Sequence, residues 1–141
     1  MKFLTVMLFS TLAAAPVFAN ETYNTEVVKQ DDNRWKIQKV MVSSRQEGTH
    51  VSGRMTATNR FGLPHGHIDI AAYSPSGELL AETTSKYTPA ILTHKKKQKG
   101  GVRFAANFTD KLPPNSTVKV AFHNNESGPS SGPEHSVNIA R

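Results

Sequence analysis

Histidines are the residues of this sequence best able to do chemistry, and His65 and His67 lie two positions apart. Successive side chains of a β-strand point to opposite faces, so residues at i and i+2 share a face. Neutral imidazoles are common ligands for copper and zinc. The pair is therefore either half of a metal site or two polar side chains at the entrance of a strand.

The segment after this pair alternates apolar and polar residues, which is typical of a strand buried on one face. If its two isoleucines face the core, then His65, His67 and Asp69 face outward together. The same alternation in residues 118–122 places His123 on the outer side of its own strand. Each of these positions would then be open to a ligand.

A period of two runs through most of the chain after residue 20, and turn residues separate the alternating segments. We find no convincing amphipathic helix in this part of the sequence. About seven short strands at this spacing predict an all-β, two-sheet Greek-key sandwich of the immunoglobulin type. The expected strands cover residues 35–44, 50–59, 66–74, 78–86, 101–109, 116–124 and 135–140. A further strand over 23–29 would precede them if residues 20–30 form a sheet edge rather than a loose arm.

The immunoglobulin-like order brings several histidines to one end of the sandwich. In that order the strand over 66–74 lies antiparallel to the strand over 116–124, so His67 and His123 would be neighbours. His135 opens the last expected strand at the same end. The predicted metal ligands, for copper or zinc, are His65, His67, His123 and His135.

One short run of the chain, directly before Gly100, is strongly basic. A solvated basic turn can protect a sheet edge against pairing with other chains. Alternatively, the lysines contact an anionic partner, such as an acidic glycan, a lipid headgroup or a protein. Nucleic acid is not expected, because no aromatic residues are interleaved with the lysines. The candidate contact residues are Lys95, Lys96, Lys97 and Lys99.

Several features count against a metal site or favour another use of the same histidines. The lysine run follows His94 and would lie at the same end, where its charge would repel a divalent cation. Asp69 is the only carboxylate that the pattern places nearby, and two histidines at i and i+2 also occur by chance. Histidines titrate at about pH 6.5, so the same end could instead become more cationic on mild acidification and strengthen contact with an acidic partner.

The first 19 residues are typical of a secretory signal peptide: Lys2, an apolar run over 3–12, and small residues before Asn20. No later segment is long and apolar enough to be a second membrane-spanning candidate. We therefore expect residues 20–141 to form a single domain that is periplasmic or secreted. Without Lys2, this part holds 16 Lys and Arg residues against 11 Asp and Glu, which favours anionic partners only mildly.

The sequence contains no cysteine, which excludes thiolate metal sites, cysteine nucleophiles and redox pairs. It also has no Gly-x-Ser-x-Gly elbow, no His-Glu-x-x-His helix and no phosphate-binding glycine loop. We do not expect an enzyme.

Turn and core positions over about residues 50–122 follow a recognisable pattern. Val51-Ser52-Gly53, Asn59, the segment 67–73 and Ser76-Gly77-Glu78-Leu79-Leu80 occur in that order. This pattern resembles small exported bacterial immunoglobulin-like domains of the FxLYD-like group. The resemblance implies a sandwich fold and a binding or accessory role, and it implies no catalytic residue.

Together these features predict an exported, non-catalytic binding or accessory module with an unknown ligand. The alternative is a copper or zinc carrier that uses the histidine-rich end.

Overall fold

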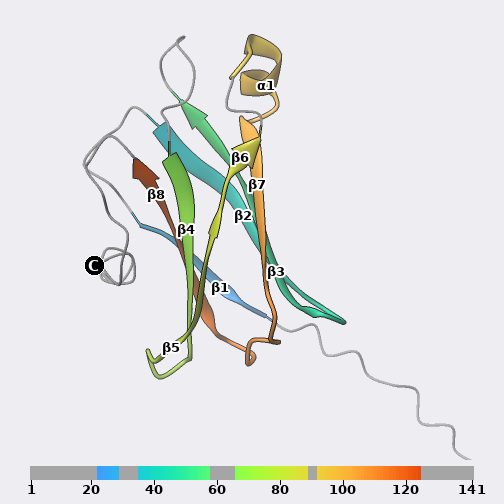
Figure 1. Cartoon of the computed structure of the whole chain (residues 1–141), viewed down its shortest axis with the longest axis vertical. Helices are drawn as coiled ribbons and strands as arrows, with labels where there is room; N and C mark the ends of the chain where they lie inside the picture. Colours follow the sequence, from blue (N-terminus) through green and yellow to red (C-terminus); the bar gives the residue numbers. More distant parts are fainter. Residues whose placement is uncertain (1–21, 29–34, 58–65, 89–91, 125–141) are drawn as a thin grey trace, which may run out of the picture.

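The computed structural model describes residues 22–28, 35–57, 66–88 and 92–124, which form two four-stranded sheets packed as a sandwich (Figure 1). Sheet A has the strand order β1-β8-β4-β5, and sheet B has the order β2-β3-β7-β6. The predicted all-β, two-sheet sandwich is confirmed. The elements are β1 (Asn24–Val27), β2 (Trp35–Arg45), β3 (Gly48–Ala57), β4 (Gly66–Tyr73), β5 (Leu79–Ser85), β6 (Tyr87–Thr88), α1 (His94–Gln98), β7 (Val102–Phe108) and β8 (Thr117–Asn124).

The strands form because apolar side chains alternate with polar ones, so each strand buries one face. In β3 every second residue from Thr49 onward is buried, and β7 buries Val102, Phe104 and Phe108 on the matching face. The two inward faces meet in one core, in which the largest fully buried side chains are Phe104, Phe122, Met55, Ile68 and Ile70. Trp35 of sheet B packs edge-on against Phe122 of sheet A, with ring centroids 4.8 Å apart. This contact ties the two sheets together.

The strand boundaries agree with the predicted ranges to within about two residues wherever the structure describes them. The segment at 24–27 is an edge strand, β1, which pairs in parallel with β8. The strand predicted at 135–140 lies outside the described residues. The pairs on which the predicted strand order depended, β4 with β8 and β3 with β7, are both present and antiparallel.

Two elements contradict the sequence prediction. The lysine run, expected to be a turn, forms the one-and-a-half-turn helix α1, whose first turn is capped by the hydroxyl of Thr93 accepting from the amide of Lys96. This helix buries no side chain, so it has no apolar stripe that a periodicity search could detect. The other element, β6, has only two residues.

The chain passes from sheet A to sheet B between β5 and β6. Ser85, which is buried, donates a hydrogen bond from its hydroxyl to the carbonyl of Ala105 at 2.8 Å and accepts one from the amide of Ala105 at 3.2 Å. The Ser85 hydroxyl thus provides hydrogen-bond partners for the amide and carbonyl of Ala105, which follows the last β7 residue paired with the short strand β6. Next in the chain, Tyr87 turns into the core 6.1 Å from the Phe122 ring, and its burial raises the pKa of its phenol.

Gly101 marks the start of β7 and allows a close backbone approach. Its φ is +105°, and a Cβ atom placed there would lie 2.1 Å from the carbonyl oxygen of Met55. Only glycine fits this position without a backbone shift. Among the residues that the structure describes, no helix has the length and apolar character needed to cross a membrane.

Candidate metal centre

The central pair of sheet A, β4 and β8, carries the candidate site at the start of one strand and the end of the other. Their antiparallel register places His67 directly opposite His123. Both side chains are on the outer face of the sheet. Their neighbours in the chain, Ile68 and Phe122, point to the opposite face and are buried in the core. The prediction that His67 and His123 are neighbours is confirmed.

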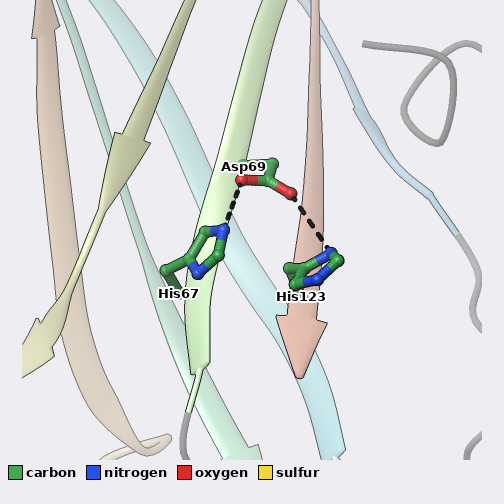
Figure 2. A group of neighbouring side chains, drawn as sticks. All are labelled: His67, Asp69 and His123. Carbon is green, nitrogen blue, oxygen red and sulfur yellow. Dashed lines mark ion pairs between the residues drawn. The ribbon is translucent and has the colours of Figure 1, made fainter. Parts of the chain in front are cut away.

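The two imidazole rings stack, with centroids 5.0 Å apart and planes inclined by 24°. Figure 2 shows Asp69, two residues along β4 from His67, with one carboxylate oxygen toward each ring. Its Oδ1 lies 3.1 Å from Nε2 of His67, and its Oδ2 lies 3.8 Å from Nδ1 of His123. We call these three residues the His–Asp cluster.

Burial differs sharply within the cluster. The side chain of Asp69 is 3% exposed, whereas those of His67 and His123 are 24% and 15% exposed. The prediction that Asp69 faces solvent is therefore wrong in one respect: the residue is on the outer face, but it is buried there. Its cross-strand neighbour is the small residue Ala121, which belongs to a compact apolar cluster on the same face.

A buried carboxylate is costly unless its charge is compensated. Two imidazoles provide that compensation if one is protonated, and a divalent metal ion provides it while both stay neutral. The cluster is therefore chemically suited to either an acid–base pair or a metal ion.

The distances within the cluster fit a metal ion. Two ligands bound to one zinc ion at about 2.0–2.1 Å lie about 3.3 Å apart in a tetrahedral arrangement. The nitrogen-to-oxygen distances, 3.1 Å to Oδ1 and 3.8 Å to Oδ2 of Asp69, lie on either side of that value. One donor atom from each of the three residues can be chosen so that all lie within 4.8 Å of one another. To bind one ion, the side chains would have to rotate so that these donor atoms move closer together.

The donor set selects among metals. Two imidazole nitrogens and one carboxylate oxygen suit zinc and copper, whereas magnesium and calcium prefer oxygen ligands alone. Three protein ligands also leave a coordination position open, as in exchangeable or catalytic sites rather than closed structural ones.

Two of the four predicted ligands, His67 and His123, belong to this cluster. His65 and His135 lie outside the described residues. His94 is the exposed first residue of α1, at the same end of the sandwich (Figure 1). His50 lies toward the opposite end, where a 2.7 Å hydrogen bond joins its Nδ1 to Asn107 Oδ1. Asp69 is not among the predicted ligands, although its spacing of two from His67 is a signal in the sequence.

The lysine run is attached to sheet B, whereas the His–Asp cluster is on sheet A. Gln38 donates a hydrogen bond to the carbonyl of Gly100 at 2.8 Å, and Arg54 donates one to the carbonyl of Gly101 at 3.1 Å. Both donors belong to strands of sheet B. The repulsion expected between the lysine run and a bound cation stays a prediction.

A scan of protein-family models finds no match to this chain, and comparisons with curated proteins and with solved structures find none either. The resemblance to FxLYD-like domains stays a prediction.

Proposed function

We propose that this protein is a non-catalytic binding domain whose ligand is one copper or zinc ion, held by His67, Asp69 and His123. The observation that supports this most strongly is the convergence of two imidazoles on one buried carboxylate at distances of 3.1 and 3.8 Å. The strand register itself brings the three side chains together, so the site needs no folding around the ion.

The partial exposure of the histidines favours exchange of the metal over permanent retention. With side chains 24% and 15% exposed, the rings can be reached from solvent while the carboxylate stays buried. The open coordination position can take water, or a donor from a protein that delivers or receives the ion. This combination suits a carrier or accessory role.

The predicted leader and the lack of cysteine support an extracytoplasmic role. An exported protein works in a compartment where free thiols are oxidised, and a histidine–carboxylate site binds metal without them. We therefore place this function in a periplasmic or secreted immunoglobulin-like module, with no catalytic step.

Calorimetric titration of the purified, metal-free protein with zinc and with copper(II) tests the proposal. We expect one ion per chain for at least one of the two metals. His67→Ala should weaken binding by more than about tenfold, since even residues that only orient a metal ligand contribute tenfold to hundredfold.

His50→Ala is the matched control, because it removes a histidine from the other end of the same sandwich. It should leave the affinity unchanged. Equal binding by His67→Ala and the unaltered protein, with both folded by circular dichroism, would show that any bound metal is held elsewhere.

A further inference from the structure

The outer face of sheet B places two arginines side by side. Arg54 of β3 is the direct cross-strand partner of Arg103 of β7, and both point away from the core because their neighbours along each strand are buried. Like charges in directly opposed positions destabilise a sheet. Arg54 donates a hydrogen bond to the carbonyl of Gly101, whereas Arg103 is exposed, and an anionic partner bound on this face would offset the repulsion between them.

More cations surround this pair. Lys36 of β2 is exposed and lies opposite Thr56, two residues from Arg54 on β3. Lys39 occupies a bulge in β2 with a φ of +56°, and its Nζ lies 3.5 Å from where a Cβ on Gly100 would be. The bulge therefore turns this lysine toward the start of β7.

The helix α1 adds its charge at the same place. Hydrogen bonds from Gln38 and Arg54 fix the carbonyls of Gly100 and Gly101 against sheet B, directly after the helix. The helix lies at this end of sheet B (Figure 1). Lys95 and Lys99, which begin and follow its last turn, are exposed. We call the following six residues the basic face: Lys36, Lys39, Arg54, Lys95, Lys99 and Arg103.

Negative charge is kept away from the basic face throughout the part of the chain that the structure describes. The carboxylates of the described residues lie on sheet A or in the turns at the end of sheet B that is away from α1. They are Glu26, Glu47, Asp69, Glu78, Glu82 and Asp110. Lys119 on sheet A, by contrast, has a carboxylate partner, Glu26, at 3.4 Å. Among the residues that the structure describes, the charges of this face are therefore all positive.

The composition of this face favours a partner recognised by charge. Within the described ranges, the large aromatic rings of sheet B, those of Trp35, Tyr87, Phe104 and Phe108, pack with the core rather than on the outer side. Bases of nucleic acids would require such rings for stacking. Anionic lipid headgroups require only cations close to the bilayer plane, and arginine forks match phosphate oxygens.

We propose that the basic face docks the protein onto a bilayer surface rich in anionic phospholipid headgroups. In this orientation the outer face of sheet A, with the His–Asp cluster, points away from the bilayer. The docking uses different residues from the metal site and does not depend on it.

Co-sedimentation with lipid vesicles tests this docking. The protein should bind vesicles of phosphatidylcholine mixed with phosphatidylglycerol, and not vesicles of phosphatidylcholine alone. The double variant Lys36→Gln/Arg103→Gln changes two exposed side chains and should lose about fivefold in partitioning for each charge removed. Added salt should weaken binding of the unaltered protein, because it screens exposed charges.

A charge-matched control separates this face from the net charge of the chain. Arg45→Gln/Lys119→Gln removes the same charge from the far end of β2 and from sheet A, and should bind nearly as well as the unaltered protein. Equal losses in the two double variants, or binding to neutral vesicles, would overturn the proposal. Binding to soluble dextran sulfate without binding to anionic vesicles would also overturn it, in favour of an acidic glycan. His67→Ala should bind vesicles normally, so failure of the metal site would be distinguished from failure of the docking.

Discussion

The outer faces of the two sheets differ in how their charged side chains are arranged. On sheet A, the carboxylate of Asp69 lies between His67 and His123, and Lys119 lies 3.4 Å from Glu26. On sheet B, two arginines oppose each other across neighbouring strands. The first arrangement concentrates donor atoms around a point and suits an ion, whereas the second spreads one sign of charge over a plane and suits an extended partner.

This difference shows how one sandwich can carry two surfaces without conflict. The alternation of side chains gives each sheet one face for the common core and one for solvent. Residues on the two outer faces are separated by the whole core, so substitutions on one face should leave the other nearly unchanged.

Phe122→Ala should have the largest effect, because the ring is almost completely buried and contacts Trp35 of the opposite sheet. Loss of a buried phenylalanine side chain costs about 3–5 kcal/mol. Urea unfolding should show this loss, and binding to zinc and to anionic vesicles should weaken together. The control Leu80→Ala removes a side chain that is 40% exposed and should change stability by less than about 0.5 kcal/mol. A comparable loss in both variants would contradict the packing described for the core.

Gly101→Ala should damage sheet B alone. The added Cβ would meet the carbonyl of Met55, and the φ of +105° is unfavourable for alanine, so we expect a cost of about 1–3 kcal/mol. Vesicle binding should fall, since this turn holds Lys95 and Lys99 beside the other residues of the basic face, while zinc affinity should stay the same.

Gly77→Ala is the matched control for that variant. Its φ is also positive, at +88°, but a Cβ there meets nothing within 4 Å. It should cost only about 1 kcal/mol and leave vesicle binding intact. If zinc affinity falls with Gly101→Ala, the two faces are more strongly coupled than the sandwich geometry implies.

Tyr87→Phe changes the segment in which the chain passes from sheet A to sheet B, and it should have the smallest effect on stability. Burial raises the pKa of its phenol in the folded state above the ordinary value of 10.0. The folded state therefore keeps a proton that the unfolded chain releases, so this contribution to stability is complete below pH 10 and is lost as the pH rises above it. The free energy of unfolding, measured from pH 9 to 11 by urea titration, should fall less steeply in Tyr87→Phe. Identical slopes would indicate that the phenol is not buried from solvent.

Much of the fold and half of the predicted metal site follow from alternation alone. A period of two identifies which side of each strand faces the core, and the order of strands then makes His67 and His123 neighbours. The helix α1 has no apolar stripe, and β6 has two residues, so neither gives a periodic signal. Periodicity therefore recovers long strands and misses short elements held by tertiary contacts.

The features that the sequence did not reveal depend on register. The burial of Asp69 requires Ala121 directly across the sheet, and the charge of the basic face requires Arg54 to meet Arg103. Cross-strand partners lie far apart in sequence, so a single strand pattern cannot align them. The predicted leader, His65 and His135 lie outside the described residues and stay predictions.

The central claim is that His67, Asp69 and His123 hold one metal ion. A crystal structure of the protein grown with zinc, with data collected across the zinc absorption edge, tests it most directly. We expect a single anomalous peak about 2.0–2.2 Å from one nitrogen of each imidazole and from a carboxylate oxygen of Asp69. Zinc bound elsewhere on the chain, with the carboxylate still paired only with the two histidines, would contradict the account.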